Sequence, residues 1–205
     1  MMGTAPARAI AALRRFAHER TDAEWCDVCT APLTSVHGHL LETATRTLRC
    51  ACPACAGLLA DTPGARWRRV SHRVTKLVGV RLTDEDWAAV GAPVDLAFFV
   101  QVGASHRVVM RYPSPGGPVE AMVEPAAWGT VVAANPALSD LRADVEALLV
   151  NRTATRREYY VVSIDECYRL VGLLRRHWRG FSGGPEVQER IAEFFASLDD
   201  VGGAP

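Results

Sequence analysis

The first third of the chain contains two cysteine-rich segments, Cys26-Asp27-Val28-Cys29 and Cys50-Ala51-Cys52-Pro53-Ala54-Cys55. Each segment contains a Cys-x-x-Cys turn, and 20 residues separate Cys29 from Cys50. Two such turns joined by a β-hairpin are the usual way to place four thiolates around one metal ion. The ion also supplies stability that so short a stretch of chain lacks. We therefore predict a zinc-ribbon-like or rubredoxin-like metal-binding module over residues 23–80.

Four of the five cysteines in this region are the expected metal ligands. We assign Cys26, Cys29, Cys52 and Cys55, because they form two pairs of the same spacing. Four thiolates leave no open coordination position, so we expect the ion to be structural rather than catalytic. Zn²⁺ is the expected ion. Iron is the alternative, because a Pro-containing turn also suits a rubredoxin-like site.

One cysteine and two histidines remain close to these ligands in the sequence. Cys50 lies two residues before Cys52, where it could be a buried thiol, a group that supports a ligand, or an exchanging ligand. His37 and His39 flank Gly38 on the predicted hairpin and could replace one thiolate. We expect these histidines instead to face solvent or to support a ligand through a hydrogen bond. Cys50 and His39 are therefore reserve candidates for the metal site.

The composition is that of a globular protein with no net charge. Of the 205 residues, 49% are hydrophobic and 22% are charged, and 23 basic side chains balance 23 acidic ones. This balance excludes a uniformly basic nucleic-acid-binding coat. No apolar run approaches the roughly 20 residues that span a bilayer, so no membrane span is expected.

The N-terminal segment, residues 1–22, is predicted to form a short amphipathic helix. Its Arg14-Arg15 pair is followed by charged residues, where an export signal requires an apolar stretch. We therefore expect a cytoplasmic protein, whose reduced cysteines favour metal over disulfides. Residues 1–82 carry 12 basic and 6 acidic side chains, a net charge of +6, whereas residues 83–205 carry 11 and 17, a net charge of −6. This shift indicates a second, acidic domain over residues 81–205.

The second domain is predicted to be α+β, because its strands and helices do not strictly alternate. We expect strands at 94–102, 107–112, 119–123 and 158–163, and helices at 125–134, 138–149, 164–178 and 185–198. A further short helix is expected to begin after Thr83 and to end at Gly91, and Ser163 with Glu166 is expected to form a capping box. In the metal module, the expected strands are 36–42, 46–51 and 66–72.

Two further segments are candidates for partner contacts. The loop from His177 to Gly184 leads into a helix N-terminus, and His177, Arg179, Gly183 and Gly184 are candidate contacts for an anion or a partner's carboxylate. The simpler interpretation is one helix stop followed by one helix start. The basic stretch Arg66–Arg73 contains one Trp and could contact nucleic acid, but a solvated strand face is favoured because no second basic cluster follows.

These motifs resemble an uncharacterised actinobacterial family, a domain of unknown function encoded near genes for nickel–iron (NiFe) hydrogenases. The resemblance covers residues from about 24 to 198. The strings that carry it are Cys26-x-x-Cys29, His39-Leu40-Leu41, Cys50-Ala51-Cys52-x-x-Cys55, Pro93-Val94-Asp95-Leu96-Ala97-Phe98-Phe99, Tyr112-Pro113-Ser114-Pro115, Asp144–Arg152, Asp165–Gly172 and His177-Trp178-Arg179-Gly180. The resemblance implies an accessory role for such an enzyme, and it implies that Cys50 belongs to the family's cysteine pattern.

The sequence leaves three functions open and ranks a fourth last. The favoured one is a non-enzymatic, zinc-binding accessory protein that binds a hydrogenase subunit or maturation factor. The alternatives are a rubredoxin-like iron electron carrier and a nucleic-acid-binding zinc-ribbon protein. An enzyme centred on His177 and Arg179 ranks last, because no set of nucleophile and base is recognisable and no catalytic residue can be assigned.

Overall fold

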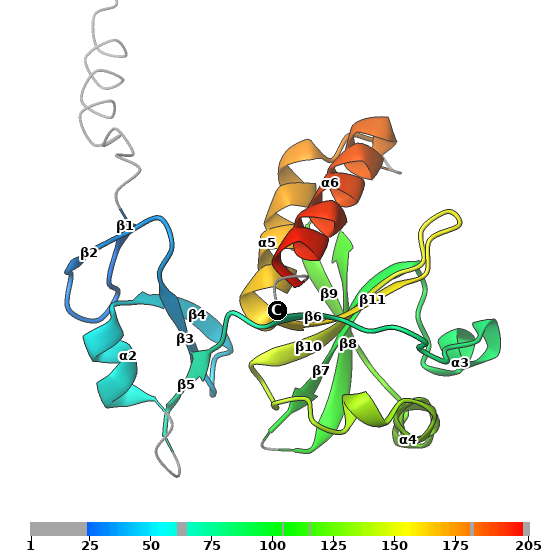
Figure 1. The fold of residues 1–205 in the computed structure, drawn as a ribbon, viewed down its shortest axis with the longest axis horizontal. Coiled ribbons are helices and arrows are strands. Elements are labelled where there is room, and N and C mark those ends of the chain that lie inside the picture. The colour runs from blue at the N-terminus through cyan, green and yellow to red at the C-terminus, as the bar shows by residue number, and fades with distance from the viewer. Residues whose placement is uncertain (1–23, 61–64, 104, 115, 181–182, 203–205) are drawn as a thin grey trace, which may run out of the picture.

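The computed structural model describes residues 24–60, 65–103, 105–114, 116–180 and 183–202. The predicted N-terminal helix, residues 1–22, lies outside these ranges. None of the helices within them combines the length and the apolar character that crossing a bilayer requires. The described chain forms a small cysteine-containing module and a larger mixed domain of helices and antiparallel strands (Figure 1).

The small module is built from five short strands and one helix. A two-stranded ribbon pairs β1 (Glu24–Trp25) with β2 (Pro32–Leu33). An antiparallel sheet in the order β4-β3-β5 follows, and its strands are β3 (Gly38–Glu42), β4 (Thr47–Ala51) and β5 (Trp67–Val70). Helix α2 (Pro53–Leu59) comes directly after β4. The predicted hairpin and third strand are therefore present.

The larger domain contains an antiparallel six-stranded sheet in the order β6-β11-β10-β7-β8-β9. Its strands are β6 (Val74–Lys76), β7 (Leu96–Val102), β8 (Arg107–Ser114), β9 (Gly117–Met122), β10 (Glu146–Asn151) and β11 (Glu158–Ser163). Its helices are α3 (Asp84–Ala89), α4 (Pro125–Ala134), a 3-10 turn (Pro136–Leu138), α5 (Ile164–His177) and α6 (Gly184–Gly202). The mixed helix-and-sheet class expected from the sequence is thus observed.

The sheet of the larger domain is covered on both faces, which explains its apolar strands. Along β7, Phe98 belongs to the core that includes α5 and α6, whereas its neighbour Phe99 packs with Trp87 and other residues on the α3 and α4 side. Successive side chains of a strand point to opposite faces. A strand buried on both faces therefore has an almost continuous run of apolar residues in its sequence. The run predicted as a buried strand at 94–102 is β7. Figure 1 shows α5 and α6 together on one face of the sheet.

The two parts of the molecule share one hydrophobic core. Leu41 of β3 and Val70 of β5 are buried in the same cluster as Ile164 and Leu170 of α5. Strand β6 lies within the range 23–80 assigned to the metal module, but it pairs with β11 of the larger sheet. The chain therefore passes from one sheet to the other between Val70 and Val74, and Figure 1 shows the small sheet beside the larger domain.

Two sequence-based predictions for the larger domain are wrong. Residues 138–149 are not a helix, because Glu146–Asn151 form β10, which lies between β11 and β7 in the sheet. A short apolar run such as Ala147–Val150 has no periodicity that separates a buried strand from a buried helix. The second error is the capping box, since Ser163 precedes α5 but its side chain makes no capping hydrogen bond. By contrast, Thr83 and Asp86 do form a capping box at the start of α3.

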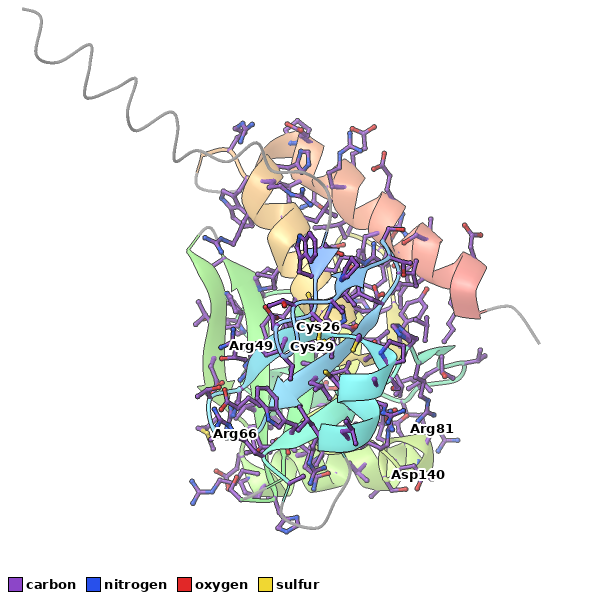
Figure 2. The ribbon with its side chains drawn as sticks, turned by 90° about the vertical axis from the view of Figure 1, so that its left-hand side faces the viewer. Cys26, Cys29, Arg49, Arg66, Arg81 and Asp140 are labelled. Atoms are coloured by element: carbon purple, nitrogen blue, oxygen red, sulfur yellow. The ribbon has the colours of Figure 1, made fainter. Side chains whose placement is uncertain are left out.

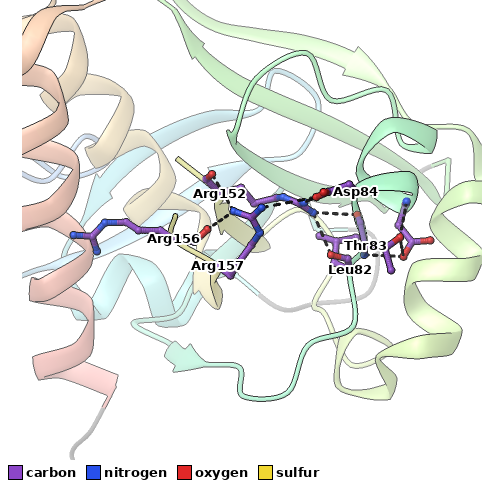
Figure 3. A network of polar contacts seen from close by, with 7 residues as sticks. Leu82, Thr83, Asp84, Arg152, Arg156 and Arg157 are labelled. Carbon is purple, nitrogen blue, oxygen red and sulfur yellow. Dashed lines mark hydrogen bonds and ion pairs between the residues drawn. The ribbon is translucent and has the colours of Figure 1, made fainter. Parts of the chain in front are cut away.

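A buried arginine attaches α3 to the sheet (Figure 3). The Arg152 side chain is 3% exposed and donates hydrogen bonds of 3.1 Å to the carbonyl oxygens of Leu82 and Thr83. Its guanidinium also pairs with Asp84 and lies 5.2 Å from the centre of the Trp87 ring. The single arginine thus satisfies backbone acceptors that precede α3.

Replacing this arginine should loosen α3. Arg152→Met removes the donor for two carbonyl groups, and an unpaired buried polar group costs about 1–3 kcal/mol. We expect a loss of about that size in the free energy of unfolding, measured by urea denaturation. Arg156→Met is the matched control, since the exposed Arg156 contacts only Glu158 at 2.9 Å among the acidic groups described, and such a change should stay within about 0.5 kcal/mol. Equal effects of the two variants would contradict the anchoring role.

Candidate metal centre

Four cysteines of the small module converge on one point. The Sγ atoms of Cys26, Cys29, Cys52 and Cys55 all lie within 4.8 Å of one another. The Sγ atoms of Cys29 and Cys52 are 3.7 Å apart. A tetrahedron with metal–sulfur bonds of about 2.3 Å has edges of about 3.8 Å, so this separation suits zinc or iron. The four cysteines could therefore hold a metal ion, and they are the four predicted as ligands.

The first cysteine pair lies in the tight turn that joins β1 to β2. The Cys26 backbone N–H donates to the Ala31 carbonyl at 2.8 Å, and the Thr30 N–H donates to the Cys26 carbonyl at 2.8 Å. Thr30 has a φ of 59°, a left-handed conformation that closes the turn. Cys26 is buried and Cys29 is exposed. Figure 2 labels both residues in a view from the side of the small module.

The second pair lies at the start of a helix, where two equivalent turns had been expected. Cys52 is the N-cap of α2, its Sγ accepts from the Cys55 N–H at 3.4 Å, and Pro53 occupies the first turn. Proline suits this position because it has no N–H to leave unpaired. The site therefore joins one β-turn and one helix N-terminus, so its second half differs from the turn expected from the sequence.

Backbone contacts hold the two halves of the site together. The Cys52 N–H donates to Cys26 Sγ at 3.3 Å. Asp27 and Cys50 are linked twice, by the Asp27 N–H to the Cys50 carbonyl at 2.9 Å and by the Cys50 N–H to Asp27 Oδ2 at 2.7 Å. Because β4 leads directly into α2, these bonds fix the first turn beside the second pair.

The electrostatics of the cluster favour a bound cation. Burial opposes ionisation of Cys26, but the backbone N–H groups of Cys52, Cys29 and Val28 outweigh it and lower the pKa of this thiol to about 6. Hydrogen bonds to the thiol groups of Cys29 and Cys52, together with burial, raise the pKa of Cys55 to about 12. The cluster thus gives up its first proton readily and its last proton with difficulty. A dication would offset the repulsion between the thiolates and displace the remaining protons.

Cys50 and His39, the reserve candidates, lie in a different cluster. Together with His37, each offers one ligand atom, and these three atoms lie within 4.8 Å of one another. The Nδ1 of His39 contacts Asp165 Oδ2 at 3.1 Å. The sequence assigned Asp165 only to the start of a helix. No local signal could have revealed this contact, because the two partners are 126 positions apart in the sequence.

The described residues of the loop between α5 and α6 contact one another and the adjoining helix ends, which also contact each other. His177 Nδ1 lies 2.6 Å from Glu186 Oε1, and this hydrogen bond lowers the pKa of Glu186. The Arg179 guanidinium donates to the carbonyl oxygens of Trp178 and Arg176, and its backbone N–H donates to Gly183. Gly183 and Gly184 have φ values of 85° and 78°. These contacts fit a helix stop and start, and the role of the four candidate residues as partner or anion contacts stays a prediction.

The basic stretch Arg66–Arg73 is engaged within the molecule. Arg66 pairs with Glu42, and Arg68 lies 3.7 Å from Asp144. Arg69 donates to the Ala56 carbonyl, and Arg73 pairs with the buried Glu146 at 3.3 Å. Two of these arginines make contacts within the small module and two connect it to the larger domain, which favours the expectation of a strand face over a nucleic-acid surface.

Comparison with known proteins identifies the family and nothing beyond it. Neither the curated proteins nor the solved structures include a significant match to this chain. A family model described as "Family of unknown function (DUF5947)" matches residues 25–201, which include both side-chain clusters and nearly all of the described chain. This match covers well over half of the sequence. The chain therefore belongs to the DUF5947 family.

Proposed function

We propose that the protein is a zinc-binding accessory protein, in which a zinc-ribbon-like module and an acidic α+β domain contact different partners. The observation that carries the proposal is the convergence of four sulfur atoms within 4.8 Å. Four thiolates complete a tetrahedral shell, so a zinc ion held by them is structural and leaves chemistry to a partner. Zinc is preferred to iron because it is the usual ion for such paired turns.

The partner is proposed to be a component of a nickel–iron (NiFe) hydrogenase, either a subunit or a maturation factor. This step rests on the resemblance of the sequence motifs. The two halves have opposite net charges, +6 for residues 1–82 and −6 for residues 83–205. This difference supports binding of a different partner by each half. One zinc ion with four thiolates changes the first value to about +4, so the N-terminal half remains basic.

A deletion strain tests this role. We expect loss of the gene to lower hydrogenase activity or assembly, and we expect affinity capture of the intact protein to recover a hydrogenase component. Complementation with the wild-type gene is the control and should restore activity. Normal activity and assembly in the deletion strain, under conditions in which the gene is expressed, would contradict the proposed role.

An iron electron carrier is the second candidate. The exposed position of Cys29 favours it, since electron transfer to a partner requires a sulfur ligand close to the surface. The two candidates differ in colour, because a ferric tetrathiolate absorbs visible light and a zinc site does not. A red protein that is reversibly reduced by one electron would replace the accessory role with electron transfer.

Nucleic-acid binding remains the third candidate and is the least supported. Most arginines of the stretch Arg66–Arg73 already pair with acidic groups or backbone carbonyls of the molecule. A titration with duplex and single-stranded oligonucleotides at two salt concentrations tests it, since phosphate contacts weaken strongly with salt.

A further inference from the structure

A second group of metal-ligating side chains lies apart from the four cysteines. It consists of His37, His39 and Cys50, whose ligand atoms lie within 4.8 Å of one another. The two imidazole rings are 4.9 Å apart, centre to centre. Two imidazoles and one thiolate form a donor set that suits zinc and neighbouring divalent transition metals.

The β-hairpin places these three residues on one face. His37 directly precedes β3, and its ligand atom lies within 4.8 Å of those of His39 and Cys50. His39 is directly opposite Cys50 in the register of β3 and β4. Leu41 continues this face and is buried in the core with α5, whereas the other face of the sheet packs Leu40 against α2. The cluster therefore lies on the side of the sheet that meets the larger domain.

The surroundings of His37 favour a bound metal ion. Its side chain is only 7% exposed, and its Nε2 atom is buried with no hydrogen-bond partner among the described residues. Its Nδ1 is already engaged, because it lies 2.9 Å from the Thr34 carbonyl oxygen and 3.1 Å from a carboxylate oxygen of Glu24. A buried nitrogen without a partner is unfavourable, so Nε2 is the atom that a metal would satisfy.

His39 is oriented in the same way. Its Nδ1 contacts Asp165 at 3.1 Å, which leaves Nε2 as the nitrogen that can bind a metal. Histidine ligands of metal ions usually donate their other ring N–H to a carboxylate or a backbone carbonyl. The Asp165 carboxylate is in position to accept such a hydrogen bond from His39, and the Thr34 carbonyl is in position to accept one from His37. Both rings therefore have the hydrogen bond that fixes a metal-binding tautomer.

We infer that His37, His39 and Cys50 form a second metal site, which binds a divalent transition-metal ion such as Zn²⁺ through three protein ligands. Three ligands leave the fourth tetrahedral position open to water or to an exogenous ligand, unlike the four-cysteine site. His39 and Cys50 are partly exposed, so the ion can exchange with solvent from their side of the site. The site lies beside the first turn of α5, and its ion would link the hairpin to the larger domain through Asp165.

Metal content tests this site in the full chain. After saturation with Zn²⁺ and removal of excess metal, we expect two zinc ions per wild-type chain. Cys50→Ser, His37→Gln and His39→Gln should each reduce the ratio to one. The matched control is His72→Gln, which changes an exposed histidine outside both clusters and should keep two ions.

Cobalt distinguishes the two sites in the same samples. Co²⁺ at the four-cysteine site should give intense sulfur-to-metal absorption, and the second Co²⁺ should add a weaker band because it has one thiolate ligand. Azide should shift only the second band, since only that ion has an open position. The intense band also shows that each variant keeps a folded module, so loss of the second band in Cys50→Ser then reports the site itself.

Asp165 is a positioning residue for this site. Asp165→Asn should weaken binding of the second ion by about 10- to 100-fold and leave the first ion unchanged. One ion per wild-type chain under saturating Zn²⁺, or two ions in Cys50→Ser, would overturn the second site and leave the four-cysteine proposal intact. Loss of the intense cobalt band in wild-type protein would instead contradict the four-cysteine site.

Discussion

Cys26→Ser and Cys55→Ser are expected to lose the ion of the four-cysteine site and to destabilise residues 24–60. Both side chains are buried, and each supplies one of four thiolates that converge from separate segments. Structural zinc sites bind with about 10–16 kcal/mol of apparent free energy, which equals or exceeds the whole stability of a typical domain at about 5–15 kcal/mol. The buried apolar cluster of the module on the α2 side consists of Leu40 and three alanines, with Leu59 and Trp67 packed partly buried against it, which is too little to replace the ion.

Elemental analysis and hydrogen exchange measure these two effects. The metal-to-chain ratio should fall by one, and amide protection should weaken over residues 24–60. Cys167→Ser is the matched control, because Cys167 is a buried thiol of α5 outside both clusters and should keep full metal content. If Ser variants at all four cysteines kept full metal content, the ligand assignment would be wrong.

Leu41→Ala should destabilise the small module and the larger domain together. Leu41 is 2% exposed and lies in the core cluster that also contains α5 and α6. Replacing a buried leucine by alanine costs about 2–5 kcal/mol, because apolar contacts are lost and a cavity remains. Urea denaturation followed by circular dichroism should show one transition, shifted to lower urea, since the two parts share this core.

Leu58→Ala provides the comparison within the same module. Leu58 is 80% exposed on α2, so its removal should change the free energy of unfolding by no more than about 0.5 kcal/mol. A Leu41→Ala variant with two separate transitions, one of them at the wild-type urea concentration, would show that the larger domain folds independently. The shared-core interpretation would then fail.

Local signals in the sequence predicted much of the fold. The hairpin at 36–51, the helix at 125–134 and the strand at 158–163 all appear, because turn residues, proline positions and β-branched runs act over a few neighbours. The strand at 146–151 was missed for a physical reason. Its residues Ala147, Leu148 and Leu149 suit a helix by propensity, but their place between two strands of the sheet overrides that preference.

The four-cysteine cluster follows from spacing alone. A Cys-x-x-Cys turn brings its two thiols to the same side of the backbone, and a short hairpin brings two such turns together. The sequence therefore determined that Cys26, Cys29, Cys52 and Cys55 would meet. It did not show that the second turn would be the first turn of α2, because a helix of seven residues leaves little periodic signal.

The tertiary structure alone separated Cys50 and His39 from those four cysteines. In the sequence Cys50 is closer to Cys52 than to any histidine, but strand register places it opposite His39. The packing of β3 against α5 then brings Asp165 to His39 across 126 residues. Spacing along a chain fixes contacts between near neighbours, whereas contacts between distant segments depend on which faces of the sheets are buried together, and that is settled only when the whole core assembles.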